Sequence, residues 1–154
     1  VASKYLAQHT ATMERVDAVL KTANERAAAA QDVVAHADTV SHETATVRDT
    51  IGRSVELAEV ANASRQDPEA AYAVQKMQEA YAASQRAAES ATARVALLAE
   101  EATKTAQIAA EAATEVATAR LAFDGATALY TAAQAADHAA ADTVTYVNEY
   151  VSNL

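Results

Sequence analysis

Apolar side chains recur along the chain at alternating spacings of three and four residues, which is the repeat of a coiled-coil seam. Early in the chain, one series of seam positions lies seven residues apart: Leu6, Met13, Leu20, Ala27 and Val34. The interleaved series is His9, Val16, Ala23, Ala30 and Ala37. After a shift in phase, the pattern predicts that the seam continues through Val40, Val47, Ile51, Val55 and Ala58. We therefore expect a first helix over about residues 3–65.

A second and more regular seam fills the rest of the chain. It runs through Val74, Met77, Tyr81, Ser84, Ala88, Ala91, Val95, Leu98, Ala102, Thr105, Ala109, Ala112, Val116, Ala119, Phe123, Ala126, Tyr130 and Ala133. It ends with Val144, Val147, Val151 and Leu154, and Asp137 alone fits the pattern poorly. Such a long, unbroken repeat is typical of a coiled coil or a long bundle helix.

Two sites interrupt the composition of these helices. Asp67 and Pro68 are typical of an N-cap and a first helical position, so we expect a loop at about 62–67 and a helix from 68. Asp124-Gly125 predicts a turn that would end this helix at 123 and begin a third helix over 126–152. The seam keeps its phase across Gly125, which favours the alternative of one straight helix.

These elements predict an all-α fold. We expect a single extended domain over 1–154, built as an elongated antiparallel bundle of three long helices, with four as the alternative, and coiled-coil-like packing.

The composition of the chain predicts a weakly packed core and excludes some classes of binding partner. Ala supplies 45 of the 79 apolar residues, while Leu, Ile, Met and Phe together number 13. Ala favours helices, but burying one methyl group gains only about 0.8 kcal/mol. The net charge is −9 with no basic block, so nucleic acid and anionic membrane surfaces are not expected partners. The chain has no Cys, which excludes thiolate catalysis and disulfides.

No arrangement of reactive residues predicts an enzyme, so we expect no catalytic, cofactor-binding or metal-binding residues and no cofactor. His42-Glu43 begins like a helical zinc motif, but Thr46 stands where the second His is needed. Asp32 and His36 share a helix face, yet two ligands alone are usually a solvated face. Asn62-Ala63-Ser64 matches the N-glycosylation sequon, which makes Asn62 a candidate glycosylation site.

Several Ala- and Glu-rich runs resemble one protein family. These runs are Ala27 to Ala30, Glu100-Glu101-Ala102-Thr103 and the stretch from Ala109 to Glu115. With the Cys-free, long-helix character, the whole chain resembles the glutamic acid/alanine-rich surface proteins of African trypanosomes and their alanine-rich relatives. The resemblance implies an extended bundle, a C-terminal glycolipid anchor and display as a dense coat in the insect-vector stage. It carries over no catalytic residues.

We therefore expect a cell-surface coat protein on the extracellular side, attached only through an anchor outside this chain, that packs laterally or self-associates. The first alternative is an intracellular coiled-coil scaffold that binds protein partners. The second is a surface receptor with a ligand at one end of the bundle, although nothing in the sequence identifies that ligand.

Overall fold

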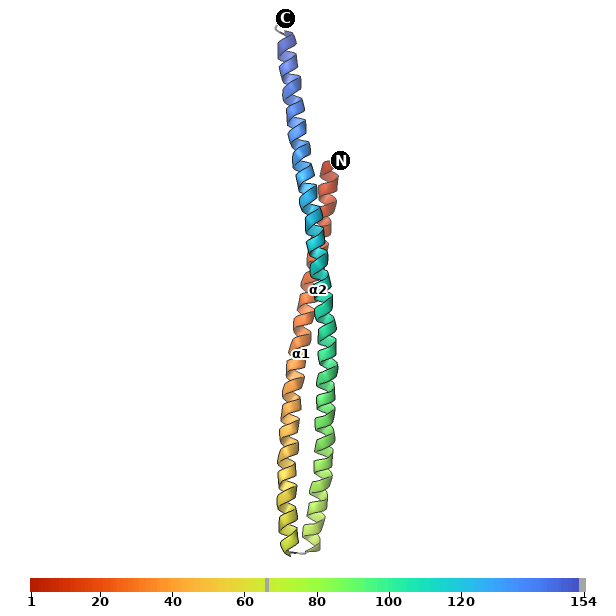
Figure 1. The fold of residues 1–154 in the computed structure, drawn as a ribbon, viewed down its shortest axis with the longest axis vertical. Helices are drawn as coiled ribbons and strands as arrows, with labels where there is room; N and C mark the ends of the chain where they lie inside the picture. The colour runs from red at the N-terminus through yellow and green to blue at the C-terminus, as the bar shows by residue number, and fades with distance from the viewer. Residues whose placement is uncertain (66, 153–154) are drawn as a thin grey trace. The chain divides into compact units, whose positions relative to one another are not determined.

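The computed structural model describes residues 1–65 and 67–152, which form two long helices that pack together (Figure 1). α1 spans Ala2–Arg65 and α2 spans Pro68–Ser152. No strand occurs among the described residues. The all-α prediction is confirmed, but the prediction of three or four helices is wrong.

The predicted turn at Asp124-Gly125 is wrong, because α2 runs through both residues without a break. The neighbours of this pair explain why. Phe123 is half-buried and Ala126 is only 1% exposed, so both lie on the inward face of the helix. A turn at Gly125 would expose them, whereas one Gly inside a helix costs only about 1 kcal/mol.

The predicted loop at 62–67 is also shorter than expected. α1 continues through Asn62 and Ser64 to Arg65, and Ser64 Oγ donates a hydrogen bond to the Val60 carbonyl at 3.0 Å. Pro68 restricts only the residue that precedes it, so it does not prevent the four residues before Gln66 from being helical. Asp67 then caps α2, since its Oδ1 accepts a hydrogen bond from the Glu69 N–H at 3.0 Å.

Contacts divide the chain into two units, and each unit contains a segment of both helices. Unit 2 comprises Glu25–Ala106, and unit 1 comprises Val1–Asn24 together with Gln107–Leu154. In unit 2 the two segments are antiparallel and joined at Asp67 (Figure 1). The prediction of a single domain stays a prediction.

Buried and half-buried residues mark the seam, which we write with heptad letters, a and d being the inward positions. In α1 the seam alternates spacings of four and three from Ala2 to Asn62. In α2 it does the same from Ala70 to Tyr130, as predicted from Val74 onward. The buried apolar residues are Val16, Ala23, Val55, Val74, Ala88, Ala102, Ala109, Ala112 and Ala126. Six of these nine are Ala, so the core is thin.

The predicted shift in phase after Ala37 is wrong. The inward positions that follow Ala37 are Ser41, Thr44 and Arg48, and the repeat continues unchanged to Ile51 and Val55. Val40 and Val47 are instead 41% and 54% exposed. Both occupy g, the position just before each a residue. Polar residues at the inward positions make the neighbouring valines look like the seam.

Three contacts in unit 2 fix how its segments are aligned. A Cβ built on Gly52 would lie 3.0 Å from Cε2 of the Tyr81 ring. Ser41 Oγ and Thr92 Oγ1 are 3.3 Å apart. Gln78 Nε2 donates a hydrogen bond to Glu59 Oε1 at 2.6 Å. Gln78, Thr92 and Glu59 all occupy e, the position just after each d residue, so the e positions of both segments lie on one side.

Candidate functional site

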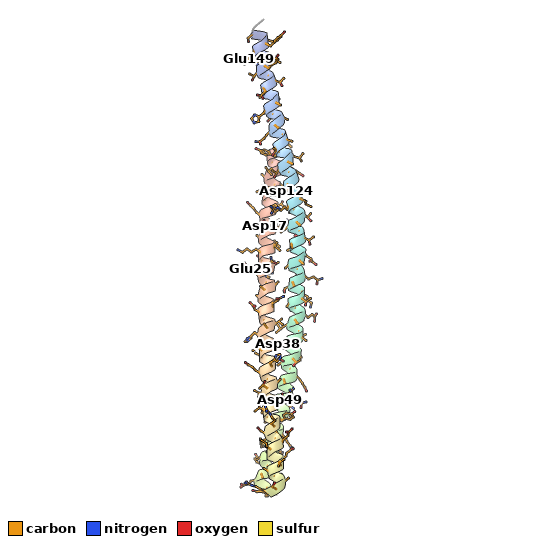
Figure 2. The ribbon with its side chains drawn as sticks, turned by 60° about the vertical axis from the view of Figure 1, so that its left-hand side comes forward. Asp17, Glu25, Asp38, Asp49, Asp124 and Glu149 are labelled. Carbon is orange, nitrogen blue, oxygen red and sulfur yellow. The ribbon has the colours of Figure 1, made fainter. Side chains whose placement is uncertain are left out.

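The ionisable side chains of the described residues are spread singly along the helices, as the acids labelled in Figure 2 illustrate. No three His, Cys, Asp or Glu side chains among these residues come together in a group that could hold a metal ion. Asp32 and His36, which the sequence places on one face, are both exposed. The ion pairs that do form join residues no more than four apart in the sequence.

One such pair joins Glu100 and Lys104, one turn apart on α2, with 2.9 Å between Lys104 Nζ and Glu100 Oε1. Its hydrogen bond, and then its charge, lower the pKa of the Glu100 carboxyl and raise the pKa of Lys104. Lys76 acts in the same way on Glu79 at 2.7 Å and lowers the pKa of that carboxyl. Both pairs are fully exposed, so they contribute little to stability.

The histidines occupy different settings. His9 lies on the seam, as predicted, with its ring edge-on to Tyr5 at a centroid distance of 4.5 Å. His42 is exposed, with Nδ1 2.9 Å from the Asp38 carbonyl oxygen and 3.6 Å from Asp38 Oδ2. The Nδ1 atom of His42 therefore faces its own helix, in the turn that begins at Asp38.

Asn62 lies in the last turn of α1, half-buried, at a seam position. Its Oδ1 is buried without a hydrogen-bond partner. A buried acceptor left unpaired is costly, so this last turn is a weak point of α1. Glycosylation of Asn62 stays a prediction, and it would require the side-chain amide to turn outward from this position.

An apolar groove lies between the two segments of unit 2 on the side opposite Gln78 and Glu59. Its lining comprises Val33, His36, Ala37, Val40, Thr44, Ala87, Ser90, Ala91, Arg94 and Leu98. Val33, Val40, Ala87 and Arg94 are all g residues, two from each helix. The g positions of both segments therefore meet on this side, and the seam residues Ala37, Thr44, Ala91 and Leu98 form the groove floor. Such a groove is suited to receiving apolar side chains.

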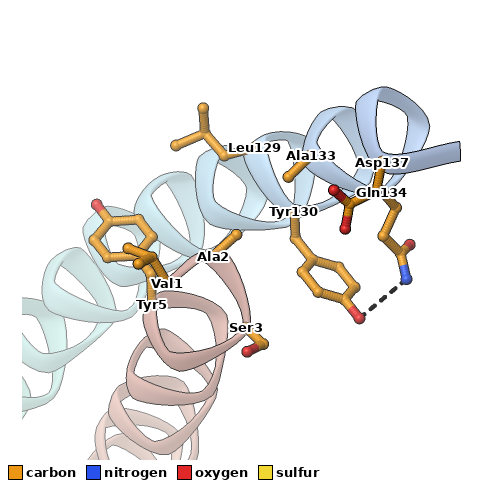
Figure 3. Close-up of a pocket in the computed structure, with 9 residues that line it drawn as sticks. All are labelled: Val1, Ala2, Ser3, Tyr5, Leu129, Tyr130, Ala133, Gln134 and Asp137. Atoms are coloured by element: carbon orange, nitrogen blue, oxygen red, sulfur yellow. Dashed lines mark hydrogen bonds between the residues drawn. The ribbon is translucent and has the colours of Figure 1, made fainter. Parts of the chain in front are cut away.

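A second hollow, in unit 1, lies where α1 begins (Figure 3). Val1, Ala2 and Tyr5 of the first turns face Leu129, Tyr130 and Ala133 of α2. Gln134 Nε2 donates a hydrogen bond to Tyr130 Oη at 3.0 Å, and Asp137 lies at the edge. It combines apolar walls with two phenols, an amide and one carboxylate.

Beyond Tyr130 every described residue of α2 is exposed, because α1 begins opposite this point. Val144, Val147 and Val151, which the sequence assigns to the seam, are 59%, 50% and 62% exposed, and the predicted seam residue Ala133 is exposed as well. Leu154, the last predicted seam residue, lies outside the described residues. The three valines keep the phase of the seam without a partner helix. Sequence periodicity alone cannot show where the partner begins.

Within the described part of the chain, no helix contains a stretch that is both long enough and apolar enough to cross a bilayer. Comparisons with families of proteins, with curated proteins and with solved structures gave no match.

Proposed function

We propose that this chain is a non-enzymatic structural protein of a cell-surface coat, held on the extracellular side by a glycolipid anchor that lies outside this chain. One observation carries the proposal: α1 and α2 are unbroken helices of 64 and 85 residues that pack along a seam of small side chains. Small seam residues let the axes of the two helices approach closely, so the helix pair is narrow, which supports dense packing of many copies in a coat. The compositional resemblance to trypanosome coat proteins supports the proposed location.

Intact source cells provide the test of this proposal. The cells are treated with a phospholipase that cleaves glycolipid anchors, and the supernatant is probed for this protein. Release into the supernatant is the expected result. Recovery of the protein only from the cytosol of lysed cells would contradict the coat function and favour the intracellular scaffold.

The scaffold alternative is supported by the apolar groove of unit 2, which is suited to another helix. A scaffold would bind a helical protein partner through that groove. Labelling intact cells with a reagent that does not cross membranes separates the two, because only a coat protein exposes Lys4 and Lys21 to it.

The receptor alternative is supported by the hollow where α1 begins, with its two tyrosines, Tyr5 and Tyr130. Its ligand would be small and partly apolar. A shift in the NMR signals of Tyr5 and Tyr130 on adding a ligand, without shifts in unit 2, would favour this function over a coat.

A further inference from the structure

The side of unit 2 on which the g residues meet carries most of its large exposed apolar side chains. Val33, Val40 and Val47, all at g on α1, are 50%, 41% and 54% exposed. Leu57 and Leu97, which occupy the neighbouring c positions, are 73% and 67% exposed. We call these five residues, with Ala80 and Ala87 between them, the g face.

In the described part of the same unit, the opposite side has no large exposed apolar side chain. Its e positions hold Gln31, Asp38 and Glu59 on α1 and Gln78, Gln85 and Thr92 on α2, and its other e residues are Ala or Gly. A helix pair that is complete on its own needs two apolar positions per heptad, whereas helices with further neighbours use three. The α1 segment of unit 2 has three valines at g in addition to apolar residues at most of its a and d positions, which is the pattern of a helix inside a larger bundle.

The g face is continuous with the packing that already exists. The floor of its groove consists of Ala37, Thr44, Ala91 and Leu98, which are seam residues of the α1–α2 interface. A helix seated there would extend that interface directly. It would also cover a thin core, whose buried members among the described residues of unit 2 are Val55, Val74, Ala88 and Ala102.

The charges on this side suit a second copy of the same face. Among the c and g positions of unit 2, the charged residues are Arg26, Glu43, Glu69, Lys76, Arg94, Glu101 and Lys104. The chain as a whole is strongly acidic, yet here four cations accompany three acids, interspersed along the face. Two copies therefore meet without opposed blocks of carboxylates, and a two-fold contact lets one patch satisfy both molecules.

We propose that the g face is a self-association surface, on which two copies of the chain pack their unit 2 helix pairs into a four-helix bundle. This inference rests on the proposed function, in which the chain is a structural protein. It adds that the partner is a second copy of the same chain. The inference is tested on the purified chain, whereas the coat function is tested on intact cells. A negative result for self-association would therefore not contradict the location on the cell surface.

The test is sedimentation equilibrium of the whole chain from about 1 µM to about 1 mM, the range of moderate to weak affinities. The variant combines Val33→Lys with Val40→Lys, which places two charges in the groove. The matched control is Val60→Lys, because Val60 occupies f, is 68% exposed and points away from the groove. We expect dimers of the wild type and of Val60→Lys, and at least tenfold weaker association of the double variant, with equal helicity by circular dichroism.

A second measurement covers the case in which the lysines disturb folding. The chain has no Cys, so Val40→Cys and Val60→Cys each introduce a single reactive thiol. A short bis-maleimide should join two copies of Val40→Cys and leave Val60→Cys mainly unjoined. A wild type that stays monomeric to the highest concentration would overturn the proposal. So would equal association, or equal cross-linking, of the groove and control variants.

Discussion

At the scale of single residues, position within the heptad decides what each side chain does. Two valines illustrate this. Val74 lies at a seam position and is buried, whereas Val40 lies at g, just before the seam residue Ser41, and is 41% exposed. Most threonines bond to their own helix, as Thr44 Oγ1 does to the Val40 carbonyl at 2.6 Å. Such bonds satisfy the hydroxyl groups within the helix, so Thr can occupy exposed and inward positions alike.

The two glycines provide a matched pair of substitutions. A Cβ at Gly125 meets no atom within 4 Å, so Gly125→Ala should stabilise α2 by about 0.5–1 kcal/mol through reduced backbone entropy. Gly52→Ala should gain less, because its Cβ would press on the Tyr81 ring. Thermal unfolding followed by circular dichroism measures both. A lower melting temperature for Gly125→Ala would indicate a turn at Asp124-Gly125 after all.

The Glu100–Lys104 pair sets a pH window. The lowered pKa of Glu100 gives stability that is present above the ordinary carboxyl value of 4.5 and lost as pH falls through the folded pKa. The raised pKa of Lys104 gives stability that is present below 10.5 and lost as pH rises through its folded pKa. We expect Lys104→Ala to raise the pKa of Glu100 toward 4.5 in a carbon-13 NMR titration. Glu79, paired with Lys76, is the control that should not move.

At the scale of elements, the sequence predicts most of the packing. The seam positions of α1 up to Ala37, and those of α2 from Val74 to Tyr130, are inward as predicted. Prediction fails where the inward residues are polar, at Ser41, Thr44 and Arg48, because hydrophobic periodicity follows the nearest valines instead. It also fails at Gly125, where composition indicates a turn that the packing of Phe123 and Ala126 overrides. The polar inward residues also explain why the groove cannot be predicted from the sequence, because the hydrophobic periodicity assigns Val40 to the core instead of to the groove.

The cap of α2 is a localised contributor to stability. Asp67 Oδ1 accepts the Glu69 N–H, and the Asp67 carbonyl accepts the Ala71 N–H at 3.0 Å. We expect Asp67→Ala to lower the free energy of unfolding by about 1 kcal/mol, because one helical donor loses its acceptor. Urea unfolding measures the change. Asp67→Ser keeps an acceptor oxygen and should retain most of the stability, and equal losses in both variants would contradict the capping role.

The end of α2 should be far less protected than the rest of the helix. Residues 131–152 are exposed on every side, and an isolated helix of this length is only marginally stable in water. Amide hydrogen exchange should therefore be much faster there than around Ala109 and Ala112, which are buried. Equal protection of the two regions in dilute solution would mean that another segment covers Val144 and Val147.

At the scale of the whole molecule, net charge opposes the association that the apolar g face favours. Each copy carries a net charge of −9, so two copies repel at long range. The screening length falls from about 30 Å at 0.01 M salt to about 8 Å at 0.15 M. We expect the dimer fraction at fixed protein concentration to rise over this range in sedimentation experiments. A fall with added salt would mean that ion pairs, rather than apolar contacts, hold the copies together.

The unbroken phase of the two seams in unit 2 also makes the length of the helix pair adjustable. The link at Asp67 and Pro68 fixes which residues face each other, and from there the same seven-residue step repeats along both segments. Seven residues added to both helices at the same level would lengthen the pair by about 10 Å and leave every other contact in place. A single added residue would instead rotate all that follows it by about 100° and turn the seam outward. The length of the helix pair can therefore change by whole heptads, provided that both helices gain or lose the same number. The turn between the helices, the e side and the apolar g side would stay as they are.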